Sequence, residues 1–288
     1  MCRLLGYATD GRNLSLREVL GSPAADAYRG MAEIHNDGWG VSMLARPRRS
    51  PYRRDGGEAS PETEDRLYRS TDAAVDDPVF AGLADVPARS ALWHLRLASS
   101  HLPLVLENQQ PFAANGLSFT HNGDISDDEN RNIVTNRDFP VDRSVLLSTG
   151  GKSDSAVFFA VVLEYVGFGF ALDEAVAQAV RELRRTYPKS SYNCMLLSGE
   201  ELIMLRASAR HDSPERIVEL YDSYGRADQV RDYRVVRYRP IVVDEAQAGV
   251  VVASSGFPQP EEEGWRELEN DHMLVASNRT GRFHVRAL

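Results

Sequence analysis

The chain opens with Met1-Cys2-Arg3-Leu4-Leu5-Gly6-Tyr7-Ala8-Thr9, a short apolar stretch that ends at Asp10-Gly11. An apolar run of this length, closed by turn residues, is typical of a β-strand. Removal of Met1 would leave Cys2 with a thiol and a free α-amine on one residue. In model peptides the pKa of the α-amine is about 7.7–8.0 and that of the thiol about 8.5, so the amine can act as the base for its own thiol. The stretch predicts a strand that begins at a nucleophile, with a buried structural cysteine as the alternative.

The composition limits the class of protein. With 288 residues, 42% of them hydrophobic, the chain is long enough for one large core or two modest domains. A net charge of −9 argues against a general nucleic-acid binder, because phosphate contacts need a basic face. Two cysteines, Cys2 and Cys194, are too few for a disulfide framework and fit a reducing compartment. No run approaches the roughly 20 apolar residues of a membrane span, and no signal-peptide pattern is visible. We therefore expect a soluble cytoplasmic protein with no membrane or nucleic-acid partner.

The order of the apolar patterns predicts the fold class. Short apolar runs predict strands over 41–44, 91–97, 117–120, 194–197, 202–205, 235–238, 241–243 and 250–253. Helical patterns cover 15–31, 153–166 and 172–187. Helices clustered between runs of strands indicate an α+β fold with mostly antiparallel sheets. Since no internal repeat or linker is visible, the sequence favours a single domain over 1–288.

A charged segment over about 46–77 interrupts these patterns. It begins with Arg46-Pro47-Arg48-Arg49-Ser50-Pro51-Tyr52-Arg53-Arg54 and continues with Gly56-Gly57 and several acidic residues. Because few apolar residues occur in it, we expect an exposed excursion on the surface. A basic cluster can bind an anion, but charge runs are usually solvated loops.

Polar motifs follow two of the predicted strands. In Trp93-His94-Leu95-Arg96-Leu97-Ala98-Ser99, Arg96 lies at a strand end beside small residues. A guanidinium in that place can hold a carboxylate through two parallel hydrogen bonds, and a surface salt bridge is the alternative. The second motif is His121-Asn122-Gly123-Asp124. The side-chain amide of Asn122 and the backbone N–H of Gly123 can stabilise the oxyanion of acyl transfer, and a simple Asn-Gly turn is the alternative.

Two further motifs complete the set. Lys152-Ser153-Asp154-Ser155 precedes an apolar run and has the composition of a helix N-terminus, with Ser153 as the expected N-cap. The helix dipole would keep Asp154 ionised, so this carboxylate could bind a ligand ammonium. His35-Asn36-Asp37-Gly38-Trp39-Gly40 predicts a backbone corner that shapes a pocket without taking part in bond chemistry. A nucleophile, a carboxylate clamp, an oxyanion hole and an ammonium acceptor together describe a site for glutamine or a γ-glutamyl group.

In this order the motifs resemble the class II glutamine amidotransferases, whose glutaminase domain uses an N-terminal nucleophile. The matching segments are Met1-Cys2-Arg3-Leu4-Leu5-Gly6, His35 to Gly40, His94-Leu95-Arg96, Glu107-Asn108 to Pro111-Phe112, His121-Asn122-Gly123 and Ser153-Asp154-Ser155. Val251-Val252-Ala253-Ser254-Ser255, followed by Trp265, resembles the C-terminal strand pattern of the stand-alone branch. That branch includes bacterial proteins of the γ-glutamyl hercynylcysteine sulfoxide hydrolase type.

The resemblance implies a four-layer αββα sandwich of two antiparallel sheets. The site residues that it implies are the nucleophile Cys2, the oxyanion-hole residues Asn122 and Gly123, and the substrate-binding residues Arg96, Asp154, Ser99 and His94. In this arrangement Arg96 holds the substrate α-carboxylate and Asp154 accepts the α-amine. The implied activity is hydrolysis of the γ-glutamyl amide of glutamine or a γ-glutamyl conjugate through a thioester on Cys2, with no cofactor and no metal.

Departures from the family pattern leave alternatives open. Ser99 and Ser100 stand where the family often has threonine and histidine, and Ala156 stands where it usually has a glutamate that would complete a capping box. One alternative is therefore a catalytically silent or partner-docking subunit that supplies ammonia to, or binds, a separate synthase. Another is a metal hydrolase, but the spacing of the candidate ligands fits no compact motif; they are His35, His94, His101 and His121.

Overall fold

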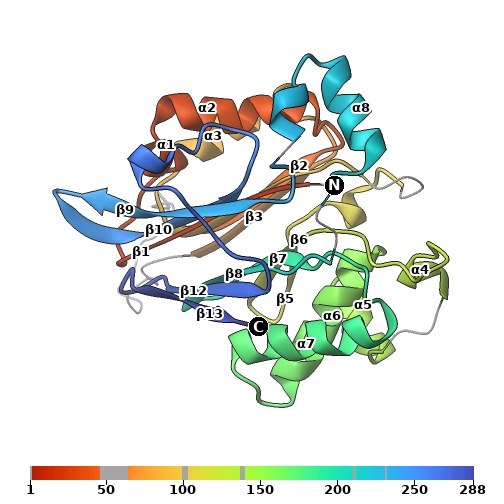
Figure 1. The fold of residues 1–288 in the computed structure, drawn as a ribbon. Helices are drawn as coiled ribbons and strands as arrows, with labels where there is room; N and C mark the ends of the chain where they lie inside the picture. Colours follow the sequence, from red (N-terminus) through yellow and green to blue (C-terminus); the bar gives the residue numbers. More distant parts are fainter. Residues whose placement is uncertain (1, 46–63, 99–102, 137–139, 210–211, 231) are drawn as a thin grey trace, which may run out of the picture.

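Two β-sheets form the centre of the fold within residues 2–45, 64–98, 103–136, 140–209, 212–230 and 232–288, which the computed structural model describes (Figure 1). The first sheet is built from β1 (Arg3–Thr9), β2 (Trp39–Ala45), β3 (Glu64–Ser70), β4 (Ala88–Leu95), β9 (Val236–Val243), β10 (Ala246–Ser254) and β11 (Arg266–Glu267). The second is built from β5 (Phe112–Ala114), β6 (Leu117–Asn122), β7 (Asn193–Leu197), β8 (Glu201–Arg206), β12 (His272–Ser277) and β13 (Phe283–Ala287). Neighbouring strands are antiparallel, in the orders β11-β9-β10-β1-β4-β2-β3 and β13-β12-β8-β7-β6-β5.

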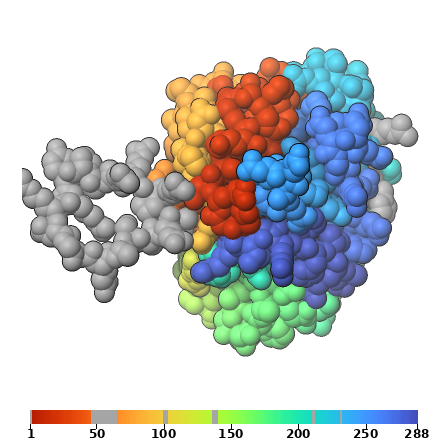
Figure 2. All heavy atoms as spheres, turned by 90° about the vertical axis from the view of Figure 1, so that its left-hand side faces the viewer, coloured from red at the N-terminus to blue at the C-terminus, as the bar shows by residue number. Residues whose placement is uncertain are grey.

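Helices cover the outer faces of the two sheets (Figure 1). The first sheet is covered by α1 (Leu16–Leu20), α2 (Ser22–Gly30) and α3 (Pro78–Ala84). The second is covered by α6 (Asp154–Gly167) and α7 (Leu172–Thr186), with α4 (Ile133–Asn136) and α5 (Arg143–Ser148) beside α6. Figure 2 shows the red and orange N-terminal layer and the green helical layer at opposite ends, with the dark blue C-terminal strands between them. The predicted αββα sandwich is confirmed.

Shorter elements complete the described chain. The helix α8 (Glu215–Ser223) lies close to the N-terminal end of the chain (Figure 1). The 3₁₀ turns are η1 (Met31–Glu33), η2 (Leu106–Asn108), η3 (Ala227–Val230) and η4 (Glu261–Glu263). No helix in the described ranges combines the length and the apolar character that crossing a membrane requires.

Apolar side chains fill the spaces between the layers. The space between the sheets holds side chains such as Leu4, Leu92, Met195 and Leu202. At Gly6 a β-carbon would lie 3.1 Å from Met195 Sδ, so the sheets approach closely beside β1. All residues of β1 are buried, which explains why its sequence is continuously apolar apart from Arg3 and Thr9.

The predicted helices are confirmed with small differences at their ends. The 15–31 pattern is divided into α1 and α2 at Gly21, and α1 begins with a capping box in which Ser15 and Glu18 bond each other's backbone N–H. The 153–166 and 172–187 patterns are α6 and α7. Nearly every side chain of α6 down to Leu163 is buried, whereas α7 buries only one face, so the two helices share an apolar contact layer.

Two sequence predictions differ from the structure. The runs 235–238 and 241–243 are not two strands but parts of β9, which continues through Pro240. Proline is tolerated there because β11 pairs only with Arg237 and Tyr238, so beyond them β9 is an edge strand within the described chain. The exposed excursion over 46–77 is wrong at its C-terminal end, since 64–70 is the edge strand β3. The remainder of that prediction, 46–63, lies outside the described residues.

A buried contact explains the return of this segment to the core. After β3 the chain buries Asp77, whose carboxylate accepts hydrogen bonds from Trp39 Nε1 at 3.1 Å and Tyr68 Oη at 2.8 Å. Asp77 also caps α3 by accepting from Val79 N at 2.9 Å. A single acidic residue in a charged run thus holds β2, β3 and α3 together.

Candidate active site

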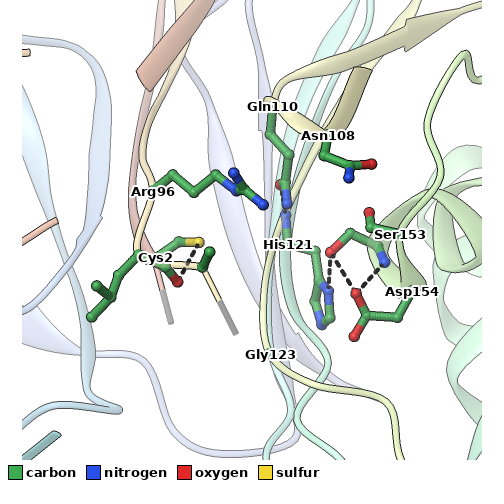
Figure 3. A pocket seen from close by; sticks show the side chains of 11 residues that line it. Cys2, Arg96, Asn108, Gln110, His121, Gly123, Ser153 and Asp154 are labelled. Atoms are coloured by element: carbon green, nitrogen blue, oxygen red, sulfur yellow. Dashed lines mark hydrogen bonds between the residues drawn. The ribbon is translucent and has the colours of Figure 1, made fainter. Parts of the chain in front are cut away.

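The motif-bearing ends of several elements meet at one end of the sandwich. Cys2 immediately precedes β1, and Arg96 immediately follows β4. Because Arg3 pairs with Leu95 in antiparallel register, Cys2 and Arg96 lie side by side. The end of β6 and the start of α6 complete one pocket, whose lining includes Cys2, Arg96, Asn108, Gln110, His121, Gly123, Ser153 and Asp154 (Figure 3).

Cys2 and Asn122 are joined by a direct hydrogen bond across 120 residues of sequence. Cys2 N donates to Asn122 Oδ1 at 2.9 Å, and Cys2 Sγ lies 3.9 Å from Leu97 O. Because the amide oxygen of Asn122 faces the cysteine nitrogen, its Nδ2 group is turned elsewhere and has no bonding partner within the described residues. The residue that holds Cys2 N therefore carries an unbonded amide donor, although Asn122 itself does not line the pocket.

Gly123 follows Asn122 at a point where no side chain fits. A β-carbon on Gly123 would lie 2.0 Å from Ser191 O and 2.4 Å from His121 Nε2. Contacts this short do not occur between real atoms, so the backbone of Gly123 is pressed against its neighbours. Its position on the pocket wall leaves the backbone N–H as a second donor near Cys2.

His121 is a fixed, neutral part of the pocket wall. Its Nε2 lies 2.8 Å from Ser191 O, and since a carbonyl can only accept, Nε2 carries the proton. Its Nδ1 then accepts from Ser155 Oγ at 2.9 Å. Burial lowers the pKa of His121 below its ordinary value, although Asp154 opposes this effect. Because both nitrogens are engaged, His121 orients its neighbours and is not free to bind a metal.

Asp154 is a buried carboxylate that faces the pocket. Its Oδ2 accepts from Ile125 N at 3.0 Å and Asn132 Nδ2 at 3.2 Å, and its Oδ1 accepts from Ser155 N at 2.8 Å. These donors are all neutral, and no lysine or arginine of the described chain forms an ion pair with it. The site thus holds a negative charge that lacks a cation.

Arg96 supplies the opposite charge, and its side chain also has no partner among the residues that the structure describes. Its side chain is 3% exposed, and Nη1 makes no hydrogen bond. Its backbone is held firmly, because Arg96 N donates to Gly38 O at 2.8 Å and Asp37 N donates to Arg96 O at 3.1 Å. Asp37 also accepts from Ala98 N at 2.7 Å. The 35–40 motif therefore positions Arg96, as a backbone corner, without itself lining the pocket.

The other predicted substrate-binding residues have different outcomes. His94 does not line the pocket; it pairs with Leu4 and Gly40 inside the sheet, deeper than Arg96. Burial, assisted by the charge of Arg96, holds the pKa of His94 well below its ordinary value. His94 was expected to contact the substrate, but the structure places it inside the sheet and not in the pocket wall. Ser99, together with Ser100 and His101, lies outside the described residues.

Asn108, Gln110 and Ser153 line the pocket although the sequence predicted no role for them in binding a substrate. Asn108 and Gln110 belong to a segment that matched the family only as a pattern, and Ser153 was expected to cap α6. Asn108 Oδ1 accepts from Lys152 N at 3.2 Å, which ties η2 to the start of α6. Gln110 Oε1 accepts from His121 N at 2.6 Å. The sequence indicated Asn108 and Gln110 only through their position between the Arg96 motif and the Asn122-Gly123 motif.

Comparison with known proteins identifies the family. The family model described as "Glutamine amidotransferases class-II" matches residues 1–286. The chain belongs to the class II glutamine amidotransferases. No curated protein matches the chain. Cys2, Arg96, Asn122 and Asp154 all lie within the region that the family model matches.

Solved structures share the fold of this class II glutamine amidotransferase at low sequence identity. A glutamine aminotransferase class-II domain protein from Silicibacter pomeroyi is 22% identical, with a TM-score of 0.59 and 99% of each chain covered. A predicted glutamine amidotransferase from Pseudomonas aeruginosa is 16% identical, with a TM-score of 0.53 and 100% of each chain covered. The glutamine phosphoribosylpyrophosphate amidotransferase of B. subtilis is 14% identical, with a TM-score of 0.54. The match covers 100% of this chain and 49% of that one.

The unpaired charge of Arg96 makes a prediction about stability. Arg96→Met is expected to leave the free energy of unfolding unchanged or to raise it by about 1 kcal/mol, because a buried guanidinium without a hydrogen-bond acceptor or an anion opposes folding. Arg3→Met is the matched control. Arg3 is equally buried, but its guanidinium donates to Tyr233 O at 2.9 Å and Tyr221 Oη at 2.7 Å. Arg3→Met is therefore expected to lower the free energy of unfolding by about 2–3 kcal/mol. Urea unfolding measures both values, and a greater loss for Arg96→Met than for Arg3→Met would contradict the argument.

Proposed function

We propose that this class II glutamine amidotransferase hydrolyses the γ-glutamyl amide bond of glutamine or of a γ-glutamyl conjugate, with Cys2 as the nucleophile. The observation that carries the proposal is the 2.9 Å hydrogen bond between Cys2 N and Asn122 Oδ1. It brings the nucleophile residue and the amide donor of an oxyanion hole to one place. In the full chain this nitrogen belongs to the Met1–Cys2 peptide bond, and removal of Met1 converts it into an α-amine.

The first half of the reaction forms a thioester. The α-amine of Cys2 takes the thiol proton, and Sγ attacks the γ-carbonyl carbon of the substrate. The carbonyl oxygen becomes an oxyanion, which Asn122 Nδ2 and Gly123 N stabilise. The bond between the γ-carbon and the amide nitrogen then breaks, and the leaving amine takes the proton from the α-ammonium of Cys2.

Water completes the cycle. The α-amine of Cys2 removes a proton from a water molecule, whose oxygen attacks the thioester carbonyl. The same two donors stabilise the second oxyanion. The carbon–sulfur bond breaks, glutamate is released, and the thiol recovers its proton. The atoms balance with water as the co-reactant, so the cycle requires no cofactor and no metal.

The charges of the pocket select the glutamyl half of the substrate. The guanidinium of Arg96 fits an α-carboxylate, and Asp154 fits an α-ammonium. Both side chains are buried and have no oppositely charged partner among the described residues, so a zwitterionic amino acid would satisfy both at once. With the α-groups bound to these two charges, the γ-amide at the other end of the substrate would reach Cys2. We further propose that residues 1–288 form a single domain that acts in the cytoplasm. A reducing compartment agrees with the two free cysteines, Cys2 and Cys194.

An affinity label tests the proposal. An L-glutamine analogue with a chloromethyl ketone in place of the side-chain amide should alkylate Cys2, because its α-groups place the reactive carbon at Sγ. Mass spectrometry is expected to find one adduct, on an N-terminal peptide that lacks Met1 and begins with Cys2. Excess L-glutamine or a γ-glutamyl peptide should protect it. The D-enantiomer is the control, and equal labelling by both enantiomers, or labelling on Cys194, would contradict the proposal.

A further inference from the structure

Ser153 occupies a helix N-cap position but does not cap the helix. It has the extended backbone of an N-cap residue, yet its side chain makes no capping hydrogen bond to α6. Ser15 shows the ordinary behaviour, since its hydroxyl accepts from Glu18 N at 3.2 Å. A serine at this position normally stabilises its helix by bonding the second or third backbone N–H. At Ser153 the hydroxyl is therefore left for another purpose.

The hydroxyl of Ser153 is buried and has no hydrogen-bond partner within the described part of the chain. The residue is 4% exposed, and its Oγ makes no hydrogen bond. Ser153 also lines the pocket, on the wall opposite Arg96 (Figure 3). A buried polar atom without a partner costs stability unless a ligand or water satisfies it. The orphan atoms Arg96 Nη1 and Ser153 Oγ thus share one pocket from opposite sides.

Gln110 adds a third group to the same pocket. Its Oε1 must face the backbone N–H of His121, with which it forms a 2.6 Å hydrogen bond, so its Nε2 is turned the other way. Gln110 lines the pocket, and Nε2 has no hydrogen bond in the described chain. Arginine and an amide NH₂ can only donate, whereas the neighbouring Asp154 can only accept. The pocket is thus divided into a donor region and an acceptor region.

We propose that Ser153 Oγ donates a hydrogen bond to the α-carboxylate of the substrate, opposite Arg96, with Gln110 as a further donor in the same pocket. The proposal rests on the proposed function, because it assigns a residue to the glutamyl half of that substrate. A carboxylate offers about four acceptor sites, and one guanidinium fills only two of them. In a buried pocket the remaining sites need donors, which the hydroxyl of Ser153 and the amide of Gln110 provide.

The test compares two ligands that differ only in the α-carboxylate. Ammonia release from L-glutamine gives kcat and KM, and 4-aminobutyramide, which lacks the carboxylate, is measured as a competitive inhibitor. Ser153→Ala is expected to raise KM for glutamine about 10-fold with kcat within about twofold, because the contact is made equally in the ground and transition states. The inhibition constant of 4-aminobutyramide should change by less than about twofold, because that ligand does not use the hydroxyl.

Ser15→Ala provides the structural control. It removes a true helix cap far from the pocket, so it should lower the melting temperature and leave KM for glutamine unchanged. Ser153→Ala should instead raise KM and leave the melting temperature nearly unchanged, because its hydroxyl makes no capping bond. The proposal is overturned if Ser153→Ala leaves KM for glutamine unchanged, or if it weakens glutamine and 4-aminobutyramide by the same factor. If the wild-type protein releases no ammonia from glutamine and no amine from γ-glutamyl peptides, the proposed function itself fails.

Discussion

Cys2→Ser is expected to lower kcat/KM for glutamate release by about 10³-fold or more, because it removes the nucleophile of the proposed reaction. A serine hydroxyl has almost no anion near neutral pH, whereas the thiolate is the reactive form of cysteine. The exchange changes one atom and retains the nitrogen that bonds Asn122 Oδ1 at 2.9 Å, so the pocket keeps its shape. Glutamate release from glutamine and from γ-glutamyl peptides measures the loss.

Cys194→Ser is the matched control for this experiment. Cys194 lies in β7, paired with His121, and it is buried and free. Burial raises the pKa of its thiol far above the ordinary value, so it carries no reactive thiolate. Cys194→Ser should therefore keep the activity of the wild type. Comparable glutamate release by Cys2→Ser and the wild type would exclude Cys2 as the nucleophile, whereas no release by either protein would favour a silent or partner-docking subunit.

The order of the motifs predicted that Cys2, Arg96 and Asn122 lie close together, for a geometrical reason. Arg96 and Asn122 each stand at a strand end, and Cys2 stands at a strand start. In antiparallel sheets such ends lie at the same edge when their registers agree, as the pairing of Arg3 with Leu95 shows. The sequence contained the strand ends, and the family resemblance supplied the register that brings them together.

Other features could not be predicted because the same residue type serves two purposes. A serine before an acidic residue and an apolar run indicates an N-cap, and Ser153 has that place and backbone without the capping bond. Its hydroxyl lines a pocket whose other residues, such as Cys2 and Arg96, are distant in sequence, so the sequence around Ser153 does not show its surroundings. Likewise, β3 carries mostly charged residues because its side chains over 65–70, at the edge of the sheet, are half-buried or exposed, so its composition matched that of a loop.

Gly123→Ala is expected to lower kcat for glutamate release by about 10²-fold or more and to destabilise the protein by about 1–3 kcal/mol. Two effects combine in this variant. The added β-carbon would lie 2.0 Å from Ser191 O and 2.4 Å from His121 Nε2, so the 2.8 Å hydrogen bond between those two atoms must break or the chain must move. Any movement of the chain displaces Gly123 N, the proposed backbone donor to the oxyanion. Single-turnover kinetics measures the loss of kcat, and urea unfolding measures the loss of stability.

Gly167→Ala separates the steric effect from a general effect of removing glycine. Gly167 ends α6, and a β-carbon there meets no atom within 4 Å. Alanine is the better helix former, so this variant should keep full activity and be at least as stable as the wild type. If Gly123→Ala loses stability but retains kcat, the backbone of Gly123 has only a structural role. In that case Asn122 Nδ2 would be the remaining donor to the oxyanion, and Asn122→Ala should lower kcat by a larger factor than Gly123→Ala does.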